Sequence, residues 1–198
     1  MSALAVPLAL LAFHGSAQPL PAPLRAELAA TSWHSGCPVP LSGLRLLTLS
    51  HWGFDGRVHT GRLTVNATVA RPLLSVFRRL YDLRFPIRRM RPIEGNGDVT
   101  AAFSCRLAAP SPCPGSRPSG SWSQHAYGTA VDLNPVENPY TGCGRTRDRA
   151  AVSYLDRSRR RPGMVTPAVV AAFRAIGWGW GGDWTGVKDY MHFSASGH

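Results

Sequence analysis

Acidic residues are scarce in this chain of 198 residues, which has 11 Asp and Glu against 22 Lys and Arg and a formal net charge of +11. Lysine is scarcer still, because Lys188 is the only one and all other basic residues are arginine. The imbalance predicts a surface field that attracts polyanions, such as nucleic acid, anionic membrane or anionic cell-wall polymer. An arginine excess also arises from composition bias on a solvated surface, so charge alone does not select a partner.

Cysteine is rare as well. The chain has Cys37, Cys105, Cys113 and Cys143, and the absence of any Cys-x-x-Cys pair argues against a structural zinc site. Four cysteines agree with an exported protein and allow three disulfide pairings. Joining Cys105 to Cys113 closes the shortest loop and leaves Cys37 with Cys143, while four reduced, buried thiols are the alternative.

Long apolar runs are missing, and the run from Ala3 to Phe13 is too short to span a bilayer comfortably. Gly15 and Ala17 follow it where small residues precede a cleavage site, which is typical of a secretory signal peptide over residues 1–17. The usual basic start is absent, since the first arginine is Arg25. We expect export to the extracellular space or cell wall, and the alternative is an apolar extension of the folded domain.

No internal repeat is visible, and the length suits one domain with a leader. A hydrophobic content of 44% and 6 Trp argue against disorder, while 20 Gly and 17 Pro predict many turns. We expect residues 18–40, rich in Pro and Ala, to be linker-like with one short helix around Arg25 to Ala30. Residues 41–198 are expected to form a monomeric α+β domain with a small antiparallel sheet and flanking helices.

The first half of that domain predicts a hairpin, a helix and a strand. Residues 44–54 and 57–66 form two strands joined by an Asp-Gly turn. Apolar residues recur at helical spacing over 68–83, and we place the helix start near Ala70 so that Pro72 lies in the first turn. Residues 85–93 predict a strand with several arginines.

The second half begins with a long loop over residues 94–120, rich in Gly, Ser and Pro. Near the end, Thr166 is placed to cap a helix that has Pro167 at its first position and ends at Gly177. A glycine-tryptophan loop and a short final strand follow.

A carboxylate stands inside an apolar strand in the stretch SWSQHAYGTAVDLNP, where Asp132 shares one strand face with Ala130. An unpaired carboxylate on a half-buried strand is costly, so it needs a cation or several donors, and a divalent metal supplies the first. His125 precedes it, and Gly128 allows the chain to turn so that both side chains converge on one point.

A catalytic zinc site needs three protein ligands and an open position, and His192 in DYMHF is the third candidate. Taken alone, His192 could equally be a buried core histidine that makes hydrogen bonds and binds no metal. Asp189, three residues earlier, is the candidate general base, with Asp183 as its competitor and a surface pair with Lys188 as the alternative. Because positions 189 and 192 would face opposite ways on a regular strand, a turn or bulge is expected at residues 188–190.

The pattern SxHxxGxAxD, formed by Ser123, His125, Gly128, Ala130 and Asp132, is followed by DxxH at Asp189 and His192. This order resembles the VanY-like zinc D-alanyl-D-alanine carboxypeptidases, which include L-alanyl-D-glutamate endopeptidases. The closing GWGWGGDWTGVKDYMHF is similar to the endopeptidase-like branch. The resemblance covers roughly residues 44–194.

The resemblance implies a Hedgehog/DD-peptidase type α+β fold with one zinc ion held by His125, Asp132 and His192, and Asp189 as catalytic base. It also implies an arginine upstream that binds substrate and stabilises the oxyanion. Arg106 in AAFSCR matches best, with Arg89 or Arg91 as alternatives. Ser123 either binds substrate or braces the loop.

Other aromatic residues and histidines are ambiguous. Trp178, Trp180 and Trp184 are as suited to packing under the glycine loop as to a ligand platform, and Tyr127 and Tyr140 share this ambiguity. The candidate metal site excludes His51 and His59, which suit ordinary hairpin positions.

The sequence therefore predicts a secreted zinc peptidase that acts on peptide bonds involving D-amino acids in peptidoglycan stem peptides, with anionic wall polymers as further partners. A metal-stapled, non-catalytic cell-wall-binding module is the alternative. Nucleic-acid binding is not expected, because the arginines are scattered and no binding motif accompanies them.

Overall fold

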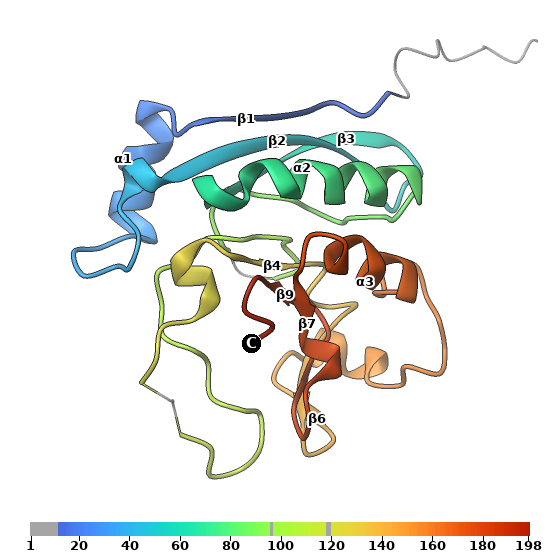
Figure 1. Cartoon of the computed structure of the whole chain (residues 1–198). Helices are drawn as coiled ribbons and strands as arrows, with labels where there is room; N and C mark the ends of the chain where they lie inside the picture. Colours follow the sequence, from blue (N-terminus) through green and yellow to red (C-terminus); the bar gives the residue numbers. More distant parts are fainter. Residues whose placement is uncertain (1–11, 96, 118–119) are drawn as a thin grey trace, which may run out of the picture.

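The computed structural model describes residues 12–95, 97–117 and 120–198. Its α+β fold is confirmed, but the strands of the described residues form three separate three-stranded antiparallel sheets rather than one (Figure 1). The α-helices are α1 (Ala22–Thr31), α2 (Ala67–Asp82) and α3 (Pro167–Arg174). The sheets, in spatial order, are β1 (Gly15–Pro19), β2 (Leu44–Trp52) and β3 (Val58–Asn66); β4 (Ala130–Asp132), β9 (His192–Ser194) and β7 (Gly179–Trp180); and β6 (Arg145–Thr146), β5 (Tyr140–Gly142) and β8 (Lys188–Asp189).

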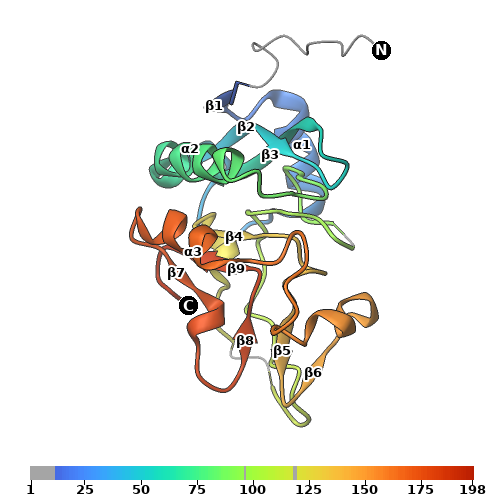
Figure 2. The ribbon, with the colours of Figure 1, turned by 90° about the vertical axis from the view of Figure 1, so that its right-hand side faces the viewer.

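Short 3-10 helices connect these elements: η2 (Leu41–Gly43), η3 (Gln124–Tyr127), η4 (Arg149–Tyr154) and η5 (Gly181–Asp183). Figure 2 shows that β5, β6 and β8 lie at the end of the molecule away from the β1–β2–β3 sheet, with β4 and β9 between them. Within the part of the chain described, no helix has both the length and the apolar character needed to cross a bilayer.

The hairpin of β2 and β3 is confirmed at the Asp-Gly turn. Gly53 N–H donates to the Arg57 carbonyl across the turn, and Gly56 has a φ of 70°, a left-handed conformation that suits glycine. The hairpin ends at Asn66, whose side-chain oxygen accepts from Thr68 N–H at 3.0 Å and so caps α2.

Because of this cap, α2 begins at Ala67 rather than near Ala70. The expectation that Pro72 lies in the first turn was therefore wrong, since Pro72 sits inside the helix. The apolar face of α2 is buried against the sheet as its spacing predicts. This face is formed by Ala70, Leu73, Val76, Phe77, Leu80 and Tyr81.

The main core lies between the β2–β3 sheet, α2, α3 and the β4–β9 pair. Phe173 of α3 stacks on Phe193 of β9 with ring centroids 3.9 Å apart, and both side chains are fully buried. The helix α3 is confirmed, because Thr166 accepts from Val169 N–H and Pro167 is the first helical residue. This core fixes β9, and with it the C-terminal candidate ligand His192.

The N-terminal segment is part of the fold, so the linker-like expectation for residues 18–40 does not describe it. The strand β1 pairs with β2 over its whole length. Leu24 and Leu28 of α1 are buried with Leu44 and Phe103 in a second core cluster, so α1 covers the end of the sheet. The short helix expected around Arg25 to Ala30 is present as α1, but it is packed, because its leucines spaced four apart bury apolar area against the sheet.

The signal peptide predicted over residues 1–17 lies mostly outside the described residues. Its last residues are described. Phe13 is partly buried against the main core, and Gly15 to Ala17 belong to β1. A cleavage after Ala17 would therefore remove three of the residues that pair with β2.

The disulfides are Cys37–Cys105 and Cys113–Cys143. The pairing of Cys105 with Cys113, which closes the shortest loop, is wrong, as is the alternative of reduced thiols. The docking of α1 brings Cys37 beside the segment after Phe103, and the turn between β5 and β6 brings Cys143 to Cys113.

The strand predicted over residues 85–93 is also wrong. Only isolated bridges occur, from Pro86 to Trp52 and from Met90 to Thr100. Proline at 86 and 92 removes two ladder donors, and Arg88 turns instead into a polar network. The loop predicted over 94–120 has no named helix or strand in its described residues.

Candidate metal centre and catalytic cleft

His125 lies on the short helix η3, which is capped by Ser123 at its start and by Gly128 at its end. The Ser123 side chain accepts from His125 N–H at 3.3 Å and caps η3. At the other end Gly128 has a φ of 66°, and a Cβ there would lie 2.7 Å from Asn66 N. Glycine is therefore required here, because any side chain would collide with the backbone at the start of α2. The expected turn at Gly128 is thus present.

Asp132 and His192 are brought together by strand pairing. They lie opposite each other in the antiparallel register of β4 and β9. Directly opposed residues in such a pair have Cβ atoms about 4.5–5.5 Å apart, so the register alone makes their side chains neighbours.

The three candidate ligands converge on one point. His125 Nε2 lies 3.2 Å from His192 Nδ1 and 3.2 Å from Asp132 Oδ1, and His192 Nδ1 lies 3.1 Å from the same oxygen. A tetrahedral zinc ion with bonds of about 2.0–2.1 Å holds its ligand atoms about 3.3–3.4 Å apart. The observed triangle therefore fits one metal ion.

Hydrogen bonding fixes which nitrogen of His125 faces the centre. His125 Nδ1 is in contact with the Ala102 carbonyl, an acceptor, so Nδ1 carries the proton and Nε2 presents a lone pair. Burial opposes a charge on His125, but the Asp132 carboxylate raises its pKa. Burial also disfavours the Asp132 anion, yet the two histidines hold its pKa below the usual value. The donor set thus suits a cation.

Asp189 reaches the same cleft from β8, which pairs Asp189 with Tyr140 of β5. The chain then turns at residues 190–191 and enters β9, so the turn that separates Asp189 from His192 lies just after the expected position. Asp189 Oδ1 is buried without a hydrogen-bond partner among the described residues. Burial first, and then the Asp132 charge, raise the pKa of Asp189 to about 7.

Arg106 lies in the cleft and pairs with Glu94, with 3.3 Å between Nε and Oε2. Burial opposes its charge, but Glu94, Asp132 and Asp189 together raise the pKa of Arg106. Arg89 donates to the Asp98 carbonyl, and neither Arg89 nor Arg91 lines the cleft. The structure thus brings Arg106, rather than the two alternatives, to the candidate centre.

The cleft has a volume of about 650 Å³ and includes all the predicted site residues. Its aromatic lining consists of Trp122, Tyr127, Tyr140 and Trp184. Trp184 also lies against His192, with ring centroids 5.5 Å apart. Trp178 is buried in the core and Trp180 packs against it, so only Trp184 of the three clustered tryptophans borders the site.

Three residues considered from the sequence lie outside the cleft. Asp183 pairs with Arg174 at 2.8 Å on the surface and does not line the cleft. His51 and His59 stack in the hairpin with centroids 5.7 Å apart, as expected of strand positions. His34, Cys37 and Cys105 also lie close enough together to hold a metal ion. They are not a metal site here, because the two cysteines form a disulfide.

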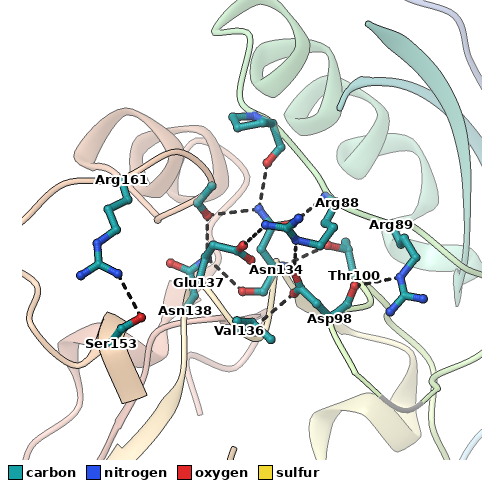
Figure 3. A network of polar contacts seen from close by, with 12 residues as sticks. Arg88, Arg89, Asp98, Thr100, Asn134, Val136, Glu137, Asn138, Ser153 and Arg161 are labelled. Carbon is teal, nitrogen blue, oxygen red and sulfur yellow. Dashed lines mark hydrogen bonds and ion pairs between the residues drawn. The ribbon is translucent and has the colours of Figure 1, made fainter. Parts of the chain in front are cut away.

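A polar network after β4, which the sequence did not reveal, supports the Asp132 side of the centre (Figure 3). Arg88 bridges two carboxylates, with Nε to Asp98 at 2.7 Å and Nη2 to Glu137 at 2.6 Å. Burial and contact with Asp98 raise the pKa of Glu137 to about 7, against the lowering effect of Arg88.

Asn134 and Asn138 extend this network to the segment that leads into α3. Asn134 has a φ of 43° and donates to the Pro86 and Gly163 carbonyls. Asn138 donates to the Leu133 carbonyl and accepts from Val165 N–H at 2.7 Å. The chain that leaves Asp132 is therefore held on both sides, which fixes the end of β4.

Comparison with known proteins identifies the C-terminal part of the chain. Residues 116–195 match a family model described as D-alanyl-D-alanine carboxypeptidase. This confirms the resemblance drawn from the two motifs and supports a peptidase of that type. A search of solved structures finds no significant match.

Proposed function

We propose, from the match of residues 116–195 to the model of the D-alanyl-D-alanine carboxypeptidase family, that the protein is an exported zinc peptidase. Its substrates would be peptide bonds involving D-amino acids in peptidoglycan stem peptides. The observation that carries the proposal is the triangle of His125 Nε2, Asp132 Oδ1 and His192 Nδ1, with sides of 3.1–3.2 Å, in a cleft that also holds Asp189 and Arg106.

Zinc would be held by His125, Asp132 and His192, and when bound it supplies Lewis acidity toward a carbonyl oxygen and toward water. Asp189 performs the proton transfers, because its buried Oδ1 is free to take a proton from the attacking water and to return it to the leaving amine. Burial raises the pKa of Asp189 above its usual value, which favours a carboxyl that can hold the proton between the two transfers.

Arg106 supplies positive charge for the oxygen that becomes anionic during attack on the carbonyl. Its guanidinium lies in the cleft and is oriented by Glu94. Ser123 braces η3 by accepting from His125 N–H, and it also lines the cleft, so its hydroxyl proton can be donated to the substrate.

Export and wall association form part of the proposal. Two disulfides are typical of proteins from oxidising compartments. A formal charge of +11 favours retention on anionic wall polymers.

The proposal is tested with the zinc-loaded protein and the pentapeptide L-Ala-γ-D-Glu-L-Lys-D-Ala-D-Ala, with fragments identified by mass spectrometry. We expect cleavage next to a D-residue, loss of cleavage with a chelator, and recovery on addition of zinc. Zinc binding at one equivalent without any cleavage of this peptide or of purified wall would favour the metal-stapled binding module instead.

A further inference from the structure

A second cavity adjoins the catalytic cleft. It has a volume of about 690 Å³ and lies between the end of α1 and residues 104–106. Ala29 to His34 form one wall, and Glu94, Gly95 and Arg106 belong to both cavities. The Arg106–Glu94 ion pair is therefore the boundary between the two cavities, and both side chains are accessible, at 35% and 38% exposure.

The walls of this cavity are fixed by covalent and hydrogen bonds. Cys105, which lines it, is joined to Cys37, in the loop that follows α1. Cys105 N–H donates to the Ser32 carbonyl, and the indole of Trp33 donates to the Val39 carbonyl. The cavity is thus preformed, since its two sides are tied together directly.

The charges around the cavity favour a cation in addition to Arg106. Glu94 is the one carboxylate among the described residues of the lining. The residues Ala29 to Thr31 are the last turn of α1, whose carbonyl end has partial negative charge, and no basic residue lies in that turn. Arg106 contacts both Glu94 oxygens at 3.3–3.4 Å, and because a carboxylate has further acceptor sites, Glu94 can orient Arg106 and still accept from a second positive group.

We propose that this second cavity is a substrate subsite, which takes a polar peptide segment and places its ammonium group against Glu94. The inference rests on the proposed function and deepens it, because it names a part of the substrate that must be present. Substrates therefore extend past Arg106, and the protein prefers a long peptide with a free side-chain amine to a dipeptide.

The matched region 116–195 contains none of the second cavity's lining residues. The subsite is consequently formed by residues 29–34, 94–95 and 104–106, which lie N-terminal to the matched region. It can be altered on α1 without touching the candidate metal ligands, Asp189 or Arg106.

Binding is measured by calorimetry on zinc-loaded Asp189→Asn protein, so that peptides remain intact. The probes are D-Ala-D-Ala, the pentapeptide named above, and the same pentapeptide with its lysine Nε acetylated. Ala30→Trp fills the cavity from an exposed helical position, and Ala26→Trp is the matched control, exposed on α1 outside the lining.

We expect the parent protein and Ala26→Trp to bind the pentapeptide about tenfold more tightly than the dipeptide and the acetylated peptide. Ala30→Trp is expected to lose this difference while its dipeptide affinity is unchanged. Equal affinities in the parent protein, or an undiminished difference in Ala30→Trp, would overturn the subsite.

The same series separates the subsite from the activity. Length-dependent binding by a wild-type protein that cleaves none of the peptides would keep the subsite and overturn the proposed function. Cleavage of dipeptide and pentapeptide with equal kcat/KM would keep the peptidase and overturn the subsite.

Discussion

Asp132 and His192 are opposite partners in the antiparallel pair of β4 and β9, and the atoms Oδ1 and Nδ1 lie 3.1 Å apart. Two of the three candidate ligands are thus set by backbone hydrogen bonding rather than by loops. A centre built on strands needs little rearrangement when an ion binds, because its donor atoms are already in place.

Asp132→Asn is expected to weaken zinc binding by more than about 100-fold, because an amide replaces the one anionic donor among the three candidate ligands. Competition with a chromophoric chelator measures the affinity. His59→Ala, in the exposed part of the hairpin, is the control and should bind zinc like the wild type. Equal affinity in Asp132→Asn would contradict the ligand assignment.

Asp189→Asn is expected to retain zinc and to lower kcat by about 10²–10⁴-fold, the usual contribution of a general base. The amide keeps the shape of the side chain but does not accept the proton. Steady-state kinetics and metal analysis of one preparation measure both effects. Asp183→Asn, on the surface with Arg174, should leave kcat unchanged, and an unaffected Asp189→Asn would remove the base from the mechanism.

Glu137→Gln is expected to change the pH dependence of stability. The folded protein raises the pKa of Glu137 from 4.5 to about 7, so it binds more protons than the unfolded chain between these values. The stability from this group is complete below pH 4.5 and is lost as pH rises to about 7. Urea unfolding at pH 5, 6 and 7 should show a free energy of unfolding that falls more steeply in the wild type than in Glu137→Gln. Parallel slopes would be inconsistent with a protonated Glu137.

Leu28→Ala is expected to lower the free energy of unfolding by about 2–5 kcal/mol, because Leu28 is fully buried under β2 and Phe103. Urea unfolding of the complete chain measures the change. Val152→Ala, at a side chain with 53% exposure, removes apolar atoms from the surface and should cost less than about 0.5 kcal/mol. A similar small effect for Leu28→Ala would show that α1 is not part of the stable core.

Elements with a strong local signal were predictable. The Asp-Gly hairpin, the buried face of α2 and the capped start of α3 follow from spacing and from Thr166 and Pro167. The stretches that failed depend on tertiary contacts. The short helix of the proline-rich segment was expected, but its packing on the sheet depends on the second core cluster, and docking decides which cysteines meet.

The candidate site shows the same division. The two motifs suggested that His125, Asp132 and His192 meet. This was predictable because each motif contains the residues that form its own local turn or strand. Glu94, the Ala102 carbonyl and the Arg88 network carry no local signal, since their contacts join residues 10 to 49 positions apart. Such supporting contacts appear only once the layers are packed.

The pairing of β4 with β9 also determines when the centre can exist. His125 and Asp132 are close along the chain, but the third candidate donor lies at position 192, next to Phe193, which stacks on Phe173 of α3. A polypeptide that lacks its last residues therefore has only two of the three candidate ligands. Metal binding at this centre would report that the C-terminal strand has paired with β4, because the three donor atoms meet only there.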